Sequence, residues 1–518
     1  MRWLLPFLLS PILHAAEKPN ILFLFADDLG RYASAYSDPD QPSANDLIDT
    51  PAFDRIAEEG AIFENAFISA PSCTPSRGAV YTGRHFFRNG SASQLHNPWV
   101  GDAADPFDKV EGMPITLSKA GYHIGWSHKW HLRESLMGGK QNQFSKHGSK
   151  INQYSQAMSK AKDPAATKAA IFKAVRDNFR DFVAKRTDAQ PFFYSFNPTN
   201  THRTWTRGSG KKLWGIDPDQ LKGRLPSSIP DTEVIREDFA DYLGEVMAFD
   251  EACAVIIDEL RTMGELDNTL VVISGDHGAP GFTRGKCNVH DFGSRVLLAM
   301  RWPGNIAPGR QVMVPVSLVD LAPTFLAAAG LQSKDDPNGE DLLPALREGA
   351  DDSKLRGWAL IGRERHVGSA RSDRLPYPVR AIRTPDFLYI RNFKPDRWPM
   401  GEPFEAAEPQ PDFASISKNT RAAFPDLDAS PTKTWLIENR DDRNLTPYLA
   451  WGWMRRPADE LYDLKKDPNQ LRNLAKDPSY QERLVTLRKR LMTELETNQD
   501  PRLEDRFDKA PYRSMDGR

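Results

Sequence analysis

The chain has only three cysteines in 518 residues: Cys73, Cys253 and Cys287. This scarcity excludes a small scaffold held by several disulfide bonds, and no two cysteines have the close spacing of a zinc site. A chain of this length can bury a core that is stable without disulfides. Cys253 lies in the apolar helical stretch 241–266, so we expect it to pack in the core.

The sequence also has little net charge and no long apolar segment after its start. Lys and Arg number 68 against 70 for Asp and Glu, which gives a net charge of −2, and we therefore expect no nucleic-acid partner. Nothing later in the chain approaches the roughly twenty apolar residues of a membrane-spanning helix. We expect no stable membrane span.

Residues 1–16 have the pattern of a secretory signal peptide. Arg2 supplies the positive start, residues 4–13 form a short apolar stretch, and Ala15-Ala16 are the small residues that precede a cleavage site. We expect an exported protein, either secreted or periplasmic. The alternative is an uncleaved segment that tethers the chain to a membrane.

Continuous apolar runs alternate with helical patterns over residues 17–345. Apolar runs without a polar face are typical of strands buried on both sides of a parallel sheet. The alternation predicts an α/β domain with a doubly wound sheet and helices on both faces, and a polar segment at 138–162 predicts a surface insertion. The predicted strands are 21–26, 191–196, 269–274 and 296–300, and the predicted helices are 51–59, 116–120, 165–185 and 235–263.

The remaining residues, 346–518, predict a smaller C-terminal α+β subdomain. Alternating runs at 380–383 and 387–390 predict a short antiparallel sheet. The apolar periodicity of residues 481–497 predicts a closing helix.

Acidic residues follow two of the predicted strands. Asp27-Asp28 comes directly after the first strand, and Asp276-His277 comes directly after the strand at 269–274. Because the carboxyl ends of parallel strands meet at one edge of a sheet, we expect both pairs to converge there. Adjacent buried acids require a positive partner, which is either a cation or a helix N-terminus.

The segment Cys73-Thr74-Pro75-Ser76-Arg77 is the most specific motif in the chain. A lone cysteine usually packs in a core. The full pentapeptide, followed by Gly-Ala-Val-Tyr-Thr-Gly-Arg at 78–84, resembles the signature of the type I sulfatases of the alkaline phosphatase superfamily. The resemblance implies an alkaline-phosphatase-like fold. It also implies that Cys73 is oxidised to formylglycine by a formylglycine-generating or anaerobic sulfatase-maturing enzyme.

In that family the formylglycine hydrate attacks the sulfur of a sulfate ester, and collapse of its second hydroxyl releases sulfate. Arg77 is implied to hold this hydrate in register with the acids. The segment 126–132 is similar to the family's Gly-Lys-x-His segment, with His128 where glycine is usual. It implies that Lys129 binds a sulfate oxygen and that His131 acts as the base for sulfate release.

Two further segments complete the resemblance. Pro198 to Arg203 matches a region whose histidine, here His202, protonates the leaving group, and Lys286 matches a second sulfate-binding cation. The implied metal site holds a divalent cation, usually calcium, and maps onto Asp27, Asp28, Cys73, Asp276 and His277. The family commonly has asparagine where His277 stands, and imidazole suits calcium less well, so the identity of the metal stays open.

Substrate specificity rests on weaker signals. Arg203 beside His202 resembles the sulfamidase (N-sulfoglucosamine sulfohydrolase) branch and could grip a carboxylate or sulfate. Arg363 and His366, in the charged segment 362–366, are candidate glycan contacts, although an exposed charged loop has the same composition.

The sequence therefore predicts an exported sulfatase that acts on O-sulfate of a sulfated carbohydrate. The alternatives are an N-sulfoglucosamine sulfohydrolase, a phosphoesterase of the same fold, and a catalytically silent glycan-binding protein. Phosphatases of this fold normally use a serine or threonine nucleophile, and a protein that only binds has no need of His131.

Overall fold

The computed structural model describes residues 18–95, 104–187, 190–406 and 410–513. The predicted signal peptide, residues 1–16, lies outside the described residues. Within the described ranges, no helix combines the length and the apolar character that crossing a membrane requires.

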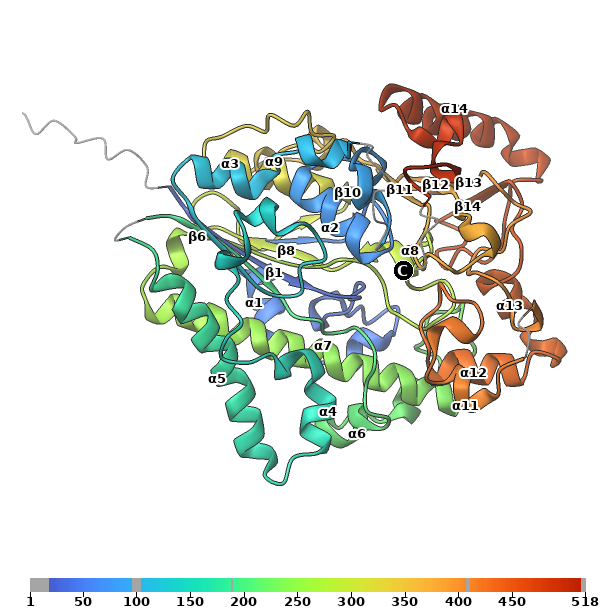
Figure 1. Cartoon of the computed structure of the whole chain (residues 1–518), viewed down its shortest axis with the longest axis horizontal. Coiled ribbons are helices and arrows are strands. Elements are labelled where there is room, and N and C mark those ends of the chain that lie inside the picture. The colour runs from blue at the N-terminus through green and yellow to red at the C-terminus, as the bar shows by residue number, and fades with distance from the viewer. Residues whose placement is uncertain (1–17, 96–103, 188–189, 407–409, 514–518) are drawn as a thin grey trace, which may run out of the picture.

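A seven-stranded sheet forms the centre of the larger part of the molecule, in the order β4-β5-β1-β6-β8-β2-β9 (Figure 1). β1 (Asn20–Ala26) pairs in parallel with β5 (Phe192–Asn197) and β6 (Thr269–Gly275), and these three strands confirm three predicted apolar runs. β4 (His123–His128) extends the parallel set beyond β5.

The predicted strand at 296–300 differs from expectation. It divides into β7 (Arg295–Val296) and β8 (Leu298–Arg301), and β8 runs antiparallel to β6. β7 instead joins a small sheet with β3 (Ala66–Phe67) and β10 (Val316–Ser317). β2 (Ala61–Phe63) and β9 (Arg310–Val312) complete the edge of the large sheet.

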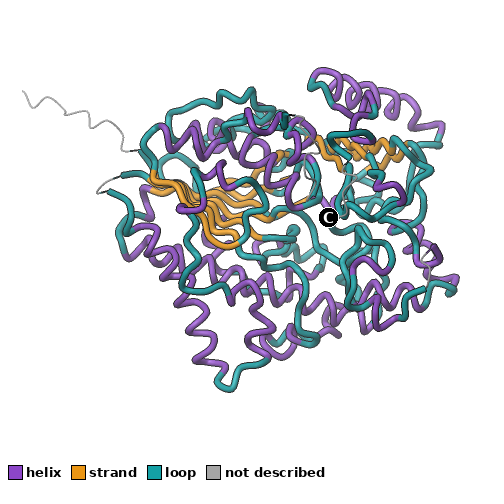
Figure 2. The backbone as a smooth tube through the Cα atoms, in the orientation of Figure 1, coloured by secondary structure: helices purple, strands orange, loops and turns teal. Residues whose placement is uncertain are grey.

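Helices cover both faces of the large sheet, as predicted. Along β1, Ile21, Phe23 and Phe25 contribute to the core on one face, and Leu22 and Leu24 contribute to the core on the other. Figure 2 shows helices on either side of the strands. The first face packs against α2 (Cys73–Thr82), α3 (Met113–Lys119) and α9 (Leu321–Ala328), and the second against α1 (Pro51–Glu58), α5 (Pro164–Val183) and α7 (Glu233–Thr262).

The helix boundaries follow from local capping. The carboxylate of Asp163 accepts a hydrogen bond of 3.0 Å from the Ala166 amide, and Pro164 occupies the first helical position of α5. The segment 138–162 is only partly a surface insertion, because it includes the short helix α4 (Tyr154–Ser159) and buries Ile151 and Tyr154.

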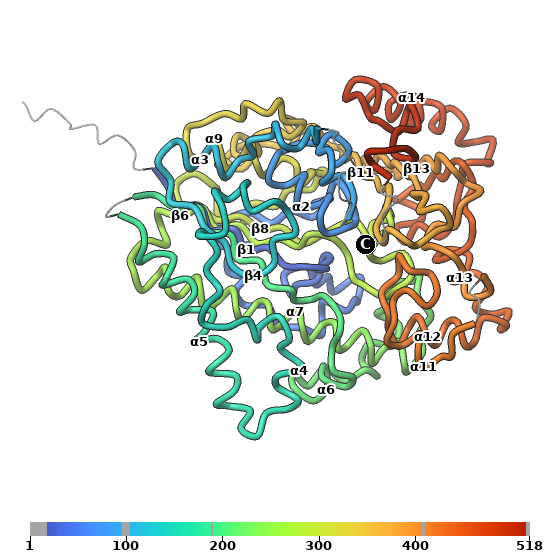
Figure 3. The backbone as a smooth tube through the Cα atoms, in the orientation of Figure 1, coloured from blue at the N-terminus to red at the C-terminus, as the bar shows by residue number. Residues whose placement is uncertain are grey.

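The C-terminal part contains a four-stranded antiparallel sheet and a long helix. The strands β11 (Ala359–Arg363), β12 (Val379–Arg383), β13 (Phe387–Asn392) and β14 (Asp459–Asp463) pair in sequence order. α14 (Gln481–Thr497) packs against this sheet through leucines at 484, 487, 491 and 495. In Figure 3 the orange and red C-terminal part lies beside the blue-to-yellow part. Ile361 and Ala381 share one buried cluster with Phe23, so the two sheets have a common core.

Shorter helices connect these elements. In the C-terminal part they include α10 (Leu343–Leu346), α11 (Phe413–Ile416), α12 (Pro431–Glu438) and α13 (Thr446–Gly452). α6 (Ser209–Trp214) and α8 (Asp291–Ser294) lie in the first part.

A buried ion-pair network fixes the chain after α14 to the C-terminal sheet. Arg380 on β12 donates to Asp500 at 2.6 Å and to Glu364 at 2.8 Å, and Arg502 also pairs with Glu364. The side chains of Arg380, Glu364 and Asp500 are fully buried. Removing one partner of such a network leaves an uncompensated buried charge.

We predict that Arg380→Ala lowers the free energy of unfolding by about 3–5 kcal/mol, because Asp500 loses its cation and Glu364 keeps only Arg502 in a desolvated site. Arg391→Ala is the matched control, since Arg391 pairs with Asp459 at 3.1 Å with 34% of its side chain exposed. That control should cost less than about 1 kcal/mol. Urea denaturation of both variants measures the difference, and equal losses would contradict the prediction.

Candidate active site

Strand register places the two acid pairs side by side. Ala26 of β1 pairs with Gly275 of β6, so Asp27 and Asp276 are the next residues on neighbouring parallel strands. The Asp28 amide donates to Asp276 Oδ1 at 2.8 Å, and the Asp276 amide donates to the Ala26 carbonyl at 3.1 Å. The prediction that both acid pairs converge at one sheet edge is therefore confirmed.

Two glycines leave room for this junction. A Cβ on Gly275 would lie 1.9 Å from the Leu29 carbonyl oxygen, and a Cβ on Gly278 would lie 2.0 Å from that of Phe292. Only glycine fits such close backbone approaches. The Asp276-His277 turn is thus fixed by glycine on both sides.

Cys73 is the first residue of α2 and faces the acid cluster. Its Sγ lies 3.2 Å from Lys129 Nζ and 3.4 Å from His277 Nε2. Burial alone would raise the pKa of the thiol, but the positive charges of Lys129, Lys286 and His277 together outweigh burial and lower the pKa to about 7. The core cysteines behave in the opposite way, since burial raises the pKa of both Cys253 and Cys287. Cys73 is therefore distinct from a structural thiol.

Arg77 links Cys73's helix to both acid strands. One helical turn after Cys73, its Nε donates to Asp276 Oδ2 at 2.9 Å, and its Nη1 donates to Asn197 Oδ1 at 3.1 Å. Its Nη2 lies 3.7 Å from Asp27 Oδ1. Arg77 is fully buried, so these contacts are made without competition from water.

Two buried lysines reach the acids from different elements. Lys129 follows β4 and its Nζ donates to Asp27, while Lys286 Nζ lies 3.0 Å from Asp28 Oδ2. Burial disfavours both ammonium groups, but Asp27 raises the pKa of Lys129 and Asp28 raises that of Lys286. Both lysines are therefore cations within reach of Cys73.

The two histidines of the predicted site lie at its mouth. His131 is exposed, and the Thr74 hydroxyl, one residue after Cys73, donates to its carbonyl at 3.2 Å. His202 follows β5 with 34% of its side chain exposed, and its Nε2 lies 3.9 Å from Asp28 Oδ2. Both imidazoles are thus open to solvent beside a buried charged cluster.

The cluster has the donor atoms of a cation site. Ligand atoms of Asp27, Cys73, Asp276 and His277 all lie within 4.8 Å of one another. Oδ1 of Asp27 and Oδ1 of Asp28 are buried without a hydrogen-bond partner. Carboxylate oxygens of this kind fit a hard divalent cation.

The imidazole ring of His277 lies against the carboxylates of this cluster. Nε2 lies 3.2 Å from Asp28 Oδ1 and 3.6 Å from Asp276 Oδ1. Burial lowers the pKa of this imidazole, yet the carboxylates of Asp276 and Asp28 outweigh burial and raise the pKa to about 9. In this arrangement a protonated His277 supplies positive charge to the acids, and a neutral His277 could join them as a nitrogen ligand for a cation.

The three predicted substrate-binding residues are placed differently from one another. Arg203 is buried, stacks over Trp205 at 3.9 Å and binds both oxygens of Asp238, at 2.8 and 2.9 Å. Arg363 is buried at the end of β11, donates to the Pro399 carbonyl and lies over the Tyr377 ring. The charge of Arg203 helps to lower the pKa of Asp428, which lies beside Lys286. The roles of Arg203 and Arg363 in substrate binding stay predictions.

His366 does reach the site, through a contact with the residue next to Cys73. Its Nδ1 lies 2.8 Å from the hydroxyl of Ser72, the residue that precedes Cys73. His366 is only 5% exposed, and burial together with Lys286 lowers the pKa of this imidazole well below its usual value. The segment 362–366 is therefore not the exposed charged loop of the alternative interpretation, since its residues are buried.

Asp428 is a site residue that the sequence analysis missed. Its Oδ2 lies 3.3 Å from Lys286 Nζ and has no hydrogen-bond partner, and its side chain is 14% exposed. Although burial raises its pKa, Lys286, His202 and His366 outweigh burial and lower the pKa well below the usual range. Asp428 lies in an irregular loop between the described elements, and no neighbouring pattern marks it in the sequence.

Comparisons with known proteins agree with this geometry. The family model described as Sulfatase matches residues 19–331. N-sulphoglucosamine sulphohydrolase of Homo sapiens is 28% identical over 92% of this chain and 89% of its own length, and an ulvan-active sulfatase of Formosa agariphila is 26% identical over 92% and 74%. A solved structure described as a complex with its substrate D-glucosamine-2-N,6-O-disulfate has the same fold, with a TM-score of 0.59 at 18% identity over 93% of this chain and 98% of that one. The chain therefore belongs to the sulfatase family.

We predict that Asp28→Asn weakens the binding of Ca²⁺ by about tenfold or more, because it removes one anionic ligand from an oxygen-rich site. The increase in melting temperature on addition of Ca²⁺ measures binding to the folded protein. Asp336→Asn is the control, since 88% of that side chain is exposed and it lies outside the cluster. An unchanged calcium response in Asp28→Asn would contradict the assignment of the site.

Proposed function

We propose that this member of the sulfatase family is an exported enzyme that hydrolyses O-sulfate esters of a sulfated carbohydrate. We further propose that it does so after Cys73 has been converted to formylglycine. The observation that carries the proposal is the position of Cys73, which lies at a helix N-terminus between Lys129 and His277 and faces buried carboxylates.

The proposed chemistry uses two groups that the chain would acquire. In its hydrated aldehyde form, residue 73 supplies one hydroxyl for attack on sulfur and a second hydroxyl whose deprotonation expels sulfate. A divalent cation, held by Asp27, Asp28, Asp276 and His277 with residue 73, would supply positive charge next to the sulfate oxygens. The oxygen donors favour calcium, although His277 leaves room for a softer metal.

The residues of the chain bind the sulfate and move protons. Lys129 and Lys286 provide fixed positive charges that stabilise the charge developing on the sulfate oxygens. Arg77 orients Asp276 and Asp27 and thereby fixes the position of residue 73, one helical turn earlier, relative to these two acids. His202 protonates the leaving oxygen, and His131 accepts the proton of the second hydroxyl of residue 73 during sulfate release. Both histidines are open to solvent, so these protons can exchange with water.

A carbohydrate substrate is supported by the names of the relatives. The Formosa agariphila protein is named an ulvan-active sulfatase, and the human protein acts on N-sulphoglucosamine by its name. The second candidate function is hydrolysis of N-sulfate on glucosamine. The similarity to the human relative over 89% of its length favours it, together with the His202-Arg203 pair.

The proposal includes a maturation partner and a location. Residue 73 is buried in the folded chain, so a formylglycine-generating or anaerobic sulfatase-maturing enzyme would act before folding is complete. The proposed location is outside the cytoplasm, secreted or periplasmic, and it rests on the signal-peptide pattern of residues 1–16.

We predict that the protein co-expressed with a formylglycine-generating enzyme releases inorganic sulfate from sulfated oligosaccharides, and that Cys73→Ala and Cys73→Ser both abolish this release. Peptide mass spectrometry confirms conversion of residue 73, and ion chromatography measures the sulfate. Cys253→Ala is the control, because Cys253 is buried in α7, and it should keep its activity. A panel that contains O-sulfated and N-sulfated sugars separates the two candidate functions.

The same experiment distinguishes the other interpretations. A phosphoesterase would release phosphate from phosphate esters and would not depend on conversion of Cys73. A glycan-binding protein would bind the panel with and without conversion and release nothing. Sulfate release that persists in Cys73→Ala would overturn the proposed mechanism.

Asp428 gives a prediction about selectivity. Its carboxylate lies beside Lys286 at the sulfate site, so it repels a second anionic group on the substrate at that position. We predict that Asp428→Asn improves kcat/KM for substrates with a neighbouring sulfate or carboxylate by about tenfold, which is about 1.4 kcal/mol, relative to substrates with a single sulfate.

The control for this prediction is Asp396→Asn, an exposed acid of the same charge. If Asp428 only positions Lys286, the substitution lowers kcat/KM for every substrate by the same factor. That uniform loss would refute a role in selectivity.

A further inference from the structure

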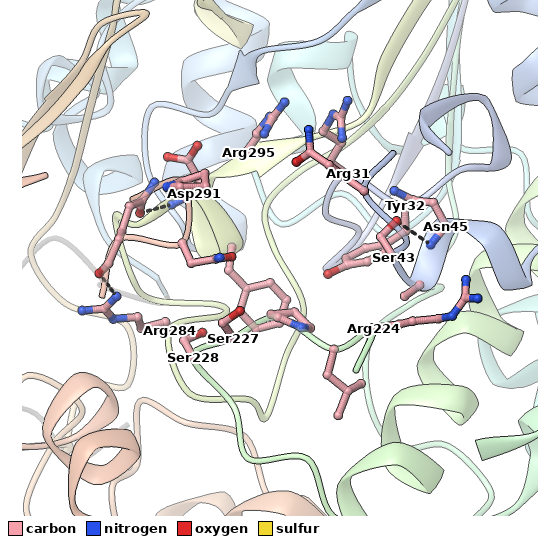
Figure 4. A pocket seen from close by; sticks show the side chains of 18 of the residues that line it. Arg31, Tyr32, Ser43, Asn45, Arg224, Ser227, Ser228, Arg284, Asp291 and Arg295 are labelled. Carbon is pink, nitrogen blue, oxygen red and sulfur yellow. Dashed lines mark hydrogen bonds between the residues drawn. The ribbon is translucent and has the colours of Figure 1, made fainter. Parts of the chain in front are cut away.

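A cavity lies apart from the cysteine cluster. It has a volume of about 430 Å³ and is lined by residues 31–32, 41–45, 223–228, 468–470 and several residues between 284 and 295. Figure 4 shows arginine side chains around it together with Tyr32, Ser43, Asn45, Ser227 and Ser228. None of the residues assigned above to catalysis or to the cation site lines this cavity.

The described residues that line the cavity carry an excess of positive charge. Four of them are arginines, and Asp291 is the one acid among them. Asp291 is already paired with Arg383, whose Nη2 lies 3.1 Å from its Oδ2. The lining therefore presents guanidinium groups without acids of its own to balance them. The four arginines are Arg31, Arg224, Arg284 and Arg295.

Two of these arginines have carboxylate partners behind the lining. Arg31 pairs with Glu64, and Arg224 pairs with Asp46 at 2.5 Å. These pairs neutralise part of the charge and hold both side chains in place. Each guanidinium nevertheless has further N–H groups beyond the single nitrogen that its carboxylate occupies.

The other two arginines make no ion pair within the described part of the chain. Arg284 donates to the Gln470 carbonyl and to the Tyr462 hydroxyl. Arg295 donates through Nε to the Glu64 carbonyl at 2.8 Å. These acceptors are neutral, so each guanidinium is compensated only by carboxylates beyond ion-pair distance: Glu460 acts on Arg284, and Asp291 and Glu64 act on Arg295.

The pKa values of Arg284 and Arg295 also reflect this desolvated environment. Burial, followed by the neighbouring Arg31, lowers the pKa of Arg295 to about 9. Burial also lowers the pKa of Arg284. Such shifts report an environment that disfavours the charged form, and a nearby anion relieves it.

Neutral donors surround the same cavity. Gln470 is 2% exposed and its side-chain nitrogen has no hydrogen-bond partner among the described residues. Ser227, beside Ser228, and Asn45, beside Ser43, also line the cavity (Figure 4). Guanidinium forks with neutral donors between them match the oxygens of sulfate and carboxylate groups.

We propose that this cavity is a second anion-binding site, which takes a sulfate or carboxylate group. The group is either a free inorganic anion or part of an acidic oligosaccharide. The site is argued from its own charges and does not rest on the proposed hydrolysis. Sulfate release in the cysteine-dependent assay and anion binding here can therefore fail independently.

The test measures binding by the full chain with Cys73 left unconverted, so that no turnover occurs. Isothermal titration with sodium sulfate at low ionic strength should reveal two sites. Lys286→Ala should remove the site at the cysteine cluster, and Ser227→Glu should weaken the other by at least about tenfold, because it adds a carboxylate to an exposed position on the cavity wall. Ser118→Glu, which adds the same charge at an exposed position outside the cavity, should leave both sites unchanged.

A second arm identifies the source of the anion. The same variants are titrated with a sulfated oligosaccharide and with its desulfated, carboxylate-bearing form. Weakening by Ser227→Glu in the oligosaccharide titrations alone assigns the cavity to a group on a glycan chain, and weakening in the sulfate titration assigns it to the free ion as well.

Arg224→Gln provides an independent variant, since Arg224 is partly exposed and the substitution breaks only its partly exposed ion pair with Asp46. It should weaken the same binding event in the same direction. The proposal is overturned if Ser227→Glu and Arg224→Gln both bind sulfate and the oligosaccharides as tightly as the unaltered chain does.

Discussion

The burial of three carboxylates at one sheet edge is the constraint on which the rest of the site depends. Asp27, Asp28 and Asp276 are fully buried, and an isolated buried carboxylate would lose several kcal/mol of solvation. Each is held by a cation from another element: Lys129 after β4, Lys286 in the loop after β6, and Arg77 on α2. Two of these cations, Lys129 and Lys286, are the side chains proposed above to bind the sulfate group. In that proposal, one arrangement neutralises the acids in the free protein and binds the anion in the complex.

The C-terminal part completes this arrangement rather than only covering it. Asp428 contacts Lys286, and His366 contacts Ser72 beside Cys73. Both residues come from segments that follow the large sheet in sequence, yet they lie within the same charged cluster. The shared core of the two sheets and the Arg380 network keep these segments in place. The site is thus assembled from both parts of the chain.

The sequence predicted the elements whose signals are local. β1 and β6 were found because each is an unbroken apolar run, and α14 was found over residues 481–497 because its leucines recur at helical spacing. β4, with the sequence HIGWSH, was missed because its polar residues interrupt that pattern. The antiparallel direction of β8 and the position of Asp428 depend on tertiary pairing, which no local pattern encodes. The convergence of the acids was predicted because the carboxyl ends of parallel strands meet at one edge of the sheet. The partners of the two arginines, Asp238 for Arg203 and the Pro399 carbonyl for Arg363, were not predicted.

The loop after β6 contributes a cation to each of the two proposed anion sites. Lys286 contacts Asp28 in the cysteine cluster, while Arg284, two residues earlier, lines the second cavity. Gly285 lies between them, and a Cβ there would be 2.2 Å from the Ala279 carbonyl oxygen. Arg284 and Cys287 both have positive φ angles, at 60° and 70°, so both adopt a left-handed backbone conformation that is uncommon for residues other than glycine. Close packing of this loop accompanies the placement of Lys286 at the cysteine cluster and of Arg284 at the second cavity. The loop can therefore serve both sites without a separate element for each.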